Sequence, residues 1–419
     1  MNSVNKAALF NASCVALVVT ALAFATRGSF VEIWVEEFNL THTQVGWIVG
    51  TAFWGFTLAM VFGGPLVDII GIGRILLIAF VCHVTGIVMT IFATGFWTLF
   101  VSTLLVGIGN GSVEAACNPL ITSMYTDEKT RRLNRFHAWF PTGIVIGGLM
   151  VYLLNKTGVT DWRVAMGAML IPTLWYGIWF LNKKFPQTER VVSGFTYKQM
   201  LKACVSPLFI FIACCMLLTA ATELGTNQWI AALMSNVTDN PILLLVWISG
   251  IMALARQFGG TLIHNMRSTV VLLTSAVLAF VGLLLLGNTT GTMVFFAAAV
   301  FALGVAFFWP SMLGFASENI PQSGALGLAI MGGIGFLGGA IAQPVLGAIY
   351  DARITAAIPP DSTIDTLSNS VAGSADASVW ESIQLAAGAD TLLYMAIVPA
   401  ILIVAFAYLY FTKRKQLAR

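Results

Sequence analysis

Charged side chains are scarce in this chain of 419 residues. Asp, Glu, Lys and Arg together make up 9% of it, whereas hydrophobic residues make up 58%. A soluble domain carries about 25% charged residues, and a surface with so few charges would not keep a monomer in water. The scarcity therefore excludes a soluble enzyme, a nucleic-acid-binding protein and a disordered chain. The remaining class is a protein whose solvent is the lipid bilayer.

The chain also lacks the short motifs of metal sites and enzymes. Its six cysteines lie in apolar runs without CxxC or Cys/His spacing, so we expect small core residues, no disulfide and no metal site. It has four histidines, and neither HExxH nor GxSxG occurs. The phosphate-binding motif GxxxxGK[ST] is absent too, which argues against direct use of ATP. We therefore expect neither an enzyme nor a bound cofactor.

Long apolar runs fill most of the sequence. A helix crosses the hydrocarbon with roughly 20 apolar residues, and the alternation typical of a membrane barrel does not occur. The sequence thus predicts an all-α membrane protein. Its twelve expected transmembrane helices lie at residues 8–37, 43–66, 73–94, 97–122, 135–154, 163–182, 204–233, 241–263, 268–287, 290–315, 323–348 and 389–412.

The basic residues predict the orientation. With both termini in the cytosol, most of the 21 Lys and Arg residues fall on the cytosolic side, as the positive-inside rule requires. We expect a multi-pass protein of the plasma membrane, which in a prokaryote is the inner membrane. The connections divide the chain into an N-terminal six-helix bundle (1–182), a cytosolic linker (183–203) and a C-terminal six-helix bundle (204–419) with an external loop at 349–388.

One short pattern occurs once in each half. Phe62-Gly63-Gly64-Pro65-Leu66 ends the second span, and Phe258-Gly259-Gly260-Thr261-Leu262 ends the eighth. Paired halves are typical of secondary transporters. Glycine allows a tight turn, and the charged residues that follow each copy can lock one face of a transporter; a plain cytosolic turn is the alternative. The candidate gating residues are Gly64, Asp68, Gly71, Arg74, His264 and Arg267.

Four residues with charged side chains lie well away from the ends of predicted spans, where an unpaired charge costs several kcal/mol. They are Arg27 in the first span, Glu114 in the fourth, Glu223 in the seventh and Arg256 in the eighth. Such residues mark substrate or ion pathways, and two bases with two acids can be neutral together. By contrast, Glu32, Glu36 and Glu37 end the first span near its surface, so we expect them to be solvated.

Asn110, Glu114 and Asn118 recur every four residues and so share one face of the fourth span. A polar stripe on an apolar helix is expected to face a cavity. A carboxylate shielded from water can carry a proton near neutral pH, which makes Glu114 the candidate proton-coupling residue. The structural alternative is a pair with Arg27, and a pair that breaks and reforms would also couple protons. His137, about a turn inside the fifth span, is a candidate proton relay or a structural histidine.

The seventh span carries a group of polar and aromatic residues: Glu223, Asn227, Gln228 and Trp229. Carboxylates and carboxamides hydrogen-bond hydroxyl groups, and an indole offers a flat apolar face, which together favour a sugar site. The alternative is a packing carboxylate and an interfacial tryptophan. Arg256 either binds substrate or pairs with Glu223. Trp309, beside a proline in the tenth span, is a candidate stacking residue.

These motifs resemble those of a known family. The run from Gly64 to Arg74 resembles the cytosolic loop signature of the major facilitator superfamily, with one residue inserted before the arginine. More narrowly, the sequence resembles the fucose permease-like sugar:proton symporters, on Gly107 to Pro119, Arg132-Leu133-Asn134 with His137, Thr222 to Trp229, Arg256-x-x-Gly259, Trp309-Pro310 and Gly327 to Asp351. It departs from them at Thr26-Arg27-Gly28-Ser29, where those permeases carry Asn-Asp near the cavity.

The resemblance implies two six-helix bundles around a central cavity and uptake by alternating access. We expect proton-coupled uptake of a monosaccharide or related polyol, with sodium as the alternative coupling ion. A carrier of a sugar acid or other organic anion, using Arg27 and Arg256, is the second interpretation. A drug exporter and a non-transporting receptor are less favoured. The expected partners are a small-molecule substrate and the bilayer, without nucleic acid, and we expect a monomer.

Overall fold

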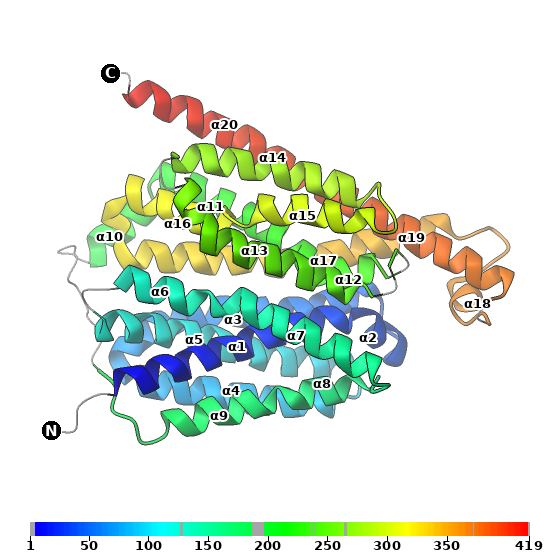
Figure 1. Ribbon diagram of the computed structural model, residues 1–419, viewed down its shortest axis with the longest axis horizontal. Coiled ribbons are helices and arrows are strands. Elements are labelled where there is room, and N and C mark those ends of the chain that lie inside the picture. Colours follow the sequence, from blue (N-terminus) through cyan, green and yellow to red (C-terminus); the bar gives the residue numbers. More distant parts are fainter. Residues whose placement is uncertain are drawn as a thin grey trace.

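The computed structural model describes residues 5–125, 129–186, 197–235, 237–238, 240–263, 266–371 and 373–417. Within these ranges all regular structure is helical. The helices run roughly parallel to one long axis, and those of the first half lie beside those of the second (Figure 1). The sequence-based fold class is therefore confirmed as an all-α membrane protein.

The first half of the chain forms α1 (Lys6–Ser29), α2 (Val31–Glu37), α3 (His42–Ile70), α4 (Ile72–Ile91), α5 (Phe96–Met124), α6 (Lys129–His137), α7 (Trp139–Lys156), α8 (Trp162–Ala168) and α9 (Leu170–Phe180). The second half begins with α10 (Tyr197–Cys204), α11 (Pro207–Ala220), the π-helix η1 (Ala221–Gly225), α12 (Thr226–Leu233), α13 (Ile242–Ile263) and α14 (Ser268–Leu286). It ends with α15 (Met293–Val305), α16 (Phe308–Asn319), the 3-10 turn η2 (Pro321–Ser323), α17 (Gly324–Ala357), α18 (Ile364–Ser368), α19 (Ala375–Met395) and α20 (Ile397–Leu417).

The described residues contain 10 helical segments that are long and apolar enough to cross a membrane. The two remaining predicted spans are helical as well: residues 163–182 correspond to α8 and α9, and residues 241–263 to α13. The predicted loop at 349–388 differs from the structure. There α17 continues to Ala357 and α19 begins at Ala375, capped by the Ser374 side chain, which accepts from the Ala377 amide. The composition suggested a loop, but its many alanines favour a helix.

The bundle has two distinct ends (Figure 1). We call the end that carries both chain termini, α6 and α10 the terminal side, and the end that carries α2, α8 and α18 the α18 side. The two halves meet where α3 packs along α17, α7 along α13, and α1 against α12. The first of these contacts is very close, because glycines face it. A Cβ atom on Gly46 would lie 2.8 Å from Pro344 Cα, and one on Gly50 would lie 3.0 Å from Ala340 O.

Gly71 makes the turn between α3 and α4. Its backbone has φ 91° and ψ 154°, a conformation that is essentially restricted to glycine. No atom lies within 4 Å of the position that its Cβ would occupy. The need for glycine here is therefore a property of the backbone and not of the surrounding space.

We expect Gly71→Ala to destabilise the protein by roughly 1–3 kcal/mol, because alanine must either adopt this strained conformation or distort the turn. Gly64→Ala is the matched control. Gly64 lies within α3 and also has open space around its Cβ position, so alanine there should be neutral or stabilise the helix by up to about 1 kcal/mol. Intrinsic tryptophan fluorescence during thermal unfolding of the purified protein measures both. Equal shifts in the two variants would contradict the backbone argument.

Candidate functional site

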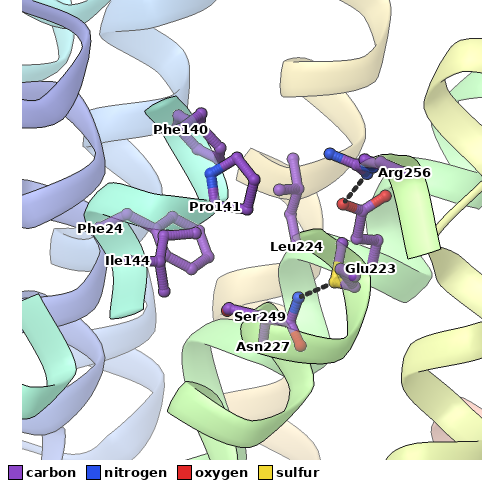
Figure 2. A pocket seen from close by; sticks show the side chains of 10 residues that line it. Phe24, Phe140, Pro141, Ile144, Glu223, Leu224, Asn227, Ser249 and Arg256 are labelled. Atoms are coloured by element: carbon purple, nitrogen blue, oxygen red, sulfur yellow. Dashed lines mark hydrogen bonds and ion pairs between the residues drawn. The ribbon is translucent and has the colours of Figure 1, made fainter. Parts of the chain in front are cut away.

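A small cavity lies between the two halves of the molecule (Figure 2). Its lining consists of Phe24 from α1, Phe140, Pro141 and Ile144 from α7, Glu223 and Leu224 from η1, Asn227 from α12, and Ser249, Met252 and Arg256 from α13. The wall from the first half is apolar. The wall from the second half carries all the hydrogen-bonding side chains, so any polar ligand would be oriented by the second half.

An ion pair forms one side of this cavity. Arg256 Nη2 lies 3.2 Å from Glu223 Oε1 (Figure 2), and Arg256 Nε donates to the Ala306 carbonyl at 2.8 Å. The Glu223 side chain is 9% exposed and the Arg256 side chain 28%. Of the two alternatives that the sequence left for Arg256, the structure shows the pair with Glu223. Breaking a buried pair from one side leaves an uncompensated charge, which is costly.

The π-helix η1 places Glu223 in the cavity wall. It interrupts the seventh predicted span between α11 and α12. A π-helical turn carries one residue more than an α-helical turn, and such turns occur often at functional sites. Close packing holds it in place, since a Cβ on Gly225 would lie 2.9 Å from Ala342 Cβ. The sequence predicted one continuous helix here, because the residues of a π-turn have no distinctive pattern.

Two polar side chains in the wall have unused hydrogen-bonding capacity. Among the described residues, no partner is found for Asn227 Oδ1 or Ser249 Oγ, although both atoms are buried. An unsatisfied buried polar atom costs about 1–3 kcal/mol, which a bound hydroxyl group or water would recover. The free space is about 10 Å³, about enough for one water molecule. A larger ligand can therefore enter only when the halves move apart.

Not all predicted substrate residues reach this cavity. Glu223, Asn227 and Arg256 line it, whereas Gln228, Trp229 and Trp309 do not. Gln228 Nε2 donates to the Phe24 carbonyl at 3.3 Å. The Trp229 ring packs 6.3 Å from the ring of His42, and the Trp309 ring lies 5.3 Å from that of Phe336. These three side chains help hold the helices together in this conformation.

The polar stripe on α5 divides between two places. Asn118 Nδ2 donates to Glu114 Oε2 at 2.9 Å, and Glu114 Oε1 lies 3.8 Å from His137 Nδ1. The His137 side chain is 45% exposed, so water reaches the vicinity of the carboxylate. Asn110 instead contacts His83, with Oδ1 2.9 Å from Nε2. One helix face therefore carries a carboxylate beside an exposed histidine at one level and an amide bound to a buried histidine at another.

Arg27 does not pair with Glu114, the structural alternative that the sequence left open for that carboxylate. Arg27 is 3% exposed, and its Nε and Nη1 have no partner among the described residues. It is close enough to His83 for their charges to interact. His83 in turn holds the Tyr176 hydroxyl at 2.8 Å through Nδ1. The first half thus contains a buried guanidinium that lacks an acceptor.

The predicted gating loop is described in part. Gly71 makes the turn, Arg74 Nη1 lies 3.4 Å from the Ile70 carbonyl oxygen, and Arg267 precedes the first residue of α14. The side chains of Asp68 and His264 lie outside the described residues. The charge lock proposed from the sequence therefore stays a prediction.

A polar cluster on the α18 side was missed by the sequence reasoning. We call it the His42 cluster; it consists of Glu32, His42, Thr43 and Asp351. The expectation that Glu32 is simply solvated is wrong, since its Oε2 lies 3.2 Å from His42 Nε2. Glu37 also differs from the expectation of a merely solvated side chain, since it accepts a hydrogen bond from Trp162 Nε1 at 2.6 Å and pairs with Arg163. The available signal was that His42 and Asp351 lie at the ends of apolar runs predicted to finish on the same side of the membrane.

Comparison with known proteins identifies relatives in sequence and in fold. A family model described as Major Facilitator Superfamily matches residues 13–343. The D-xylose transporter of Levilactobacillus brevis is 26% identical over 140 residues, which cover 33% of this chain and 30% of that protein. Myo-inositol transporter 1 of Candida albicans is 31% identical over 158 residues, covering 36% and 27%. These matches span about a third of each relative's length or less.

Several solved structures share the fold over nearly the whole chain. An inward-facing, occupied bacterial homologue of the human lysosomal transporter Spinster has a TM-score of 0.78 at 15% identity, covering 96% of both chains. The partially occluded, inward-open xylose transporter XylE from E. coli scores 0.69 at 14% identity, with 94% and 96% covered. FucP in the outward conformation scores 0.58 at 16% identity, with 94% and 98% covered. At such identities the likeness shows the fold alone.

A double-mutant cycle on the cavity pair tests its geometry. We expect Glu223→Ala and Arg256→Ala each to lower the melting temperature, because each single change leaves one charge buried without its partner. The double variant, which removes both charges, should lower the melting temperature by less than the sum of the two single effects. The coupling energy should be on the order of 0.5–3 kcal/mol. Arg353 and Asp390 form the control pair, 2.7 Å apart with both side chains 39% exposed, and should couple by about 1 kcal/mol or less. Additive effects at Glu223 and Arg256 would contradict the pairing.

Proposed function

The chain belongs to the major facilitator superfamily, and we propose that it takes up a monosaccharide or related polyol by alternating access, in symport with protons. It is a carrier and not an enzyme, as the family and fold show. The observation that carries the proposal is the polar wall between the halves. There the buried Asn227 Oδ1 and Ser249 Oγ lack partners beside the Glu223–Arg256 pair.

Hydroxyl groups match this wall chemically. A carboxylate and an amide oxygen accept from a sugar hydroxyl, while a guanidinium and a serine hydroxyl donate to it. The opposite wall, with Phe24 and Phe140, offers aromatic surface to the apolar face of a sugar ring. The relatives named for xylose and inositol support the same class of substrate. Trp309, Gln228 and Trp229 would reach the substrate only in another conformation of the transport cycle.

Glu114 is the proposed proton-linked residue. Its carboxylate is 13% exposed and has one hydrogen bond from Asn118, with His137 3.8 Å away as a relay to water. A carboxylate that is nearly buried yet close to a hydrated histidine can exchange protons with one side of the membrane. Arg27 influences this group only at a distance, since the two form no contact in this conformation. We assign it no direct part in proton coupling here.

The proposed orientation places the terminal side in the cytosol of a plasma-membrane protein. Lys and Arg concentrate in the segments on that side, including α6, α10 and the end of α20, which fits the positive-inside rule. The loop from Gly64 to Arg74 would then gate the cytosolic face. Symport as a monomer needs no second copy of the chain, because the cavity is formed within it.

Arg27 favours a second candidate, transport of a sugar acid or other organic anion. A buried guanidinium whose Nε and Nη1 lack partners has donors left over for a ligand, and a charge-assisted hydrogen bond from a guanidinium is a strong way to bind a carboxylate. Arg256 would provide a second cationic group, at the cavity itself. In this mechanism the anionic group of the substrate would accept the hydrogen bonds that Arg27 does not make in the present conformation.

Uptake into proteoliposomes distinguishes the two candidates. We expect neutral sugars and polyols such as xylose and inositol to accumulate faster when an inward proton gradient is imposed, and sodium gradients to have no effect. Uptake of sugar acids is measured in the same way, in the wild type and in Arg27→Ala. Uptake of anions alone, abolished by Arg27→Ala, would establish the second candidate instead. A panel in which no sugar is carried would contradict the first.

Glu114→Gln should uncouple transport from protons. Glutamine keeps the hydrogen bond to Asn118 but cannot exchange a proton, so accumulation against a gradient should be lost while sugar exchange across the membrane is retained in part. Counterflow and gradient-driven uptake, measured in the same vesicles, separate these activities. His137→Gln should slow proton-driven uptake less severely. Full gradient-driven uptake by Glu114→Gln would remove this residue from the coupling role.

A further inference from the structure

The His42 cluster joins the two halves of the protein on the α18 side. Glu32 comes from α2, His42 and Thr43 from the first turn of α3, and Asp351 from α17. Asp351 Oδ2 accepts from the Thr43 amide at 2.8 Å and from Thr43 Oγ1 at 2.6 Å. Its Oδ1 lies 3.1 Å from the His42 amide nitrogen and 2.8 Å from His42 Nδ1. A carboxylate of the second half therefore caps a helix of the first.

These contacts require one extra proton. Asp351 accepts from three assigned donors, the amides of His42 and Thr43 and Thr43 Oγ1, which favours its ionised form. An ionised Asp351 in turn requires a hydrogen on His42 Nδ1, 2.8 Å from its Oδ1. The other ring nitrogen, Nε2, lies 3.2 Å from Glu32 Oε2. A neutral histidine would turn a lone pair toward the Glu32 carboxylate, whereas an imidazolium donates to both carboxylates. If the hydrogen between His42 Nε2 and Glu32 Oε2 is bonded to the Glu32 oxygen instead, the cluster as a whole still holds the same number of protons.

The surroundings keep this proton between the halves. The His42 side chain is 8% exposed, while those of Glu32 and Asp351 are 23% and 27% exposed and reach the water of the α18 side. The ring of Tyr350 on α17 lies 4.5 Å from the His42 ring, and the ring of Trp229 on α12 lies 6.3 Å from it. Tyr350 and, further along α2, Glu36 are the other titratable groups nearby. Neither adds a positive charge that could replace the proton.

We propose that the α18 side closes by taking up one proton, which the His42 cluster holds between Glu32 and Asp351. Opening separates Asp351 from His42, hydrates the ring and returns the proton to water on that side, which the charge distribution predicts to be the outside. Acidity outside would therefore favour the closed state. The inference does not depend on the substrate or on proton coupling through Glu114.

Distances between spin labels on the α18 side measure closure directly. Thr160, between α7 and α8, and Thr290, between α14 and α15, are both exposed and belong to different halves. Cysteines at these sites, in a chain whose native cysteines are replaced, carry the labels in lipid nanodiscs without substrate. A histidine in water titrates near pH 6.5. Above this pH the ratio of closed to open molecules should fall by up to about tenfold per pH unit, as linkage to one proton requires.

Glu32→Gln provides the sharpest test. An amide can donate to His42 Nε2, so a neutral histidine then satisfies both neighbours and the extra proton is no longer needed. The variant should stay closed up to about pH 8.5, with the pH dependence lost. His42→Gln should lose the pH dependence too. If His42→Gln does not fold, Glu32→Gln alone decides, because a purely structural hydrogen bond would leave the slope unchanged.

Glu37→Gln is the matched control. Glu37 lies on the same helix as Glu32, but its partner Arg163 is in the same half. The hydrogen bond from Arg163 holds the pKa of Glu37 below its ordinary value, so it does not titrate between about pH 5.5 and pH 8.5. This variant should keep the wild-type slope. A wild-type ratio that is independent of pH, or an unchanged slope in Glu32→Gln, would overturn the proposal.

Discussion

Charge inside hydrocarbon must be neutralised, and this constraint organises the interior of the protein. Glu223 meets Arg256 at 3.2 Å, and Glu114 holds Asn118 at 2.9 Å with His137 nearby. Glu223 has its counter-charge within the second half and Glu114 its hydrogen bond within the first, so neither contact has to break when the halves move relative to each other. Arg27 is the exception among them, since two of its nitrogens lack an acceptor. An unpaired guanidinium at this depth is tolerable only where water or a ligand can reach it.

The long hydrophobic runs made the fold predictable, because a membrane leaves helices as the main way to satisfy the backbone. All twelve predicted spans are helical, and four-residue spacing correctly grouped Asn118 with Glu114 and Glu223 with Asn227. Spacing could not reveal which neighbouring helix a face meets. Asn110 therefore turned out to contact His83 instead of a cavity. The π-turn at Glu223 and the contact between His42 and Asp351, 309 residues apart, depend on tertiary packing alone.

Small residues give the interface between the halves its shape. At Gly46 and Gly50 the backbones of α3 and α17 approach closely, which brings the first turn of α3 within reach of Asp351. Further along the same two helices, Thr57 Oγ1 donates to the Gly333 carbonyl at 3.1 Å, and the ring of Phe56 stacks on Phe336 at 3.6 Å. In membranes, helices associate through such close packing and occasional hydrogen bonds. The seam is therefore a set of many weak contacts, with the His42 cluster as its charged end.

The central cavity and the His42 cluster share a structural element, because α12 contacts both. Asn227 lines the cavity, and two residues later Trp229 packs beside the His42 ring. Between them, Gln228 donates to the carbonyl of Phe24, whose side chain forms the opposite cavity wall. Both the Gln228 hydrogen bond and the His42 cluster join the two halves, so we expect a displacement that parts His42 from Asp351 to strain this hydrogen bond as well. In the present conformation the closed α18 side and the free space of about 10 Å³ occur together. The α12 helix is therefore the element through which the cluster and the cavity are in structural contact.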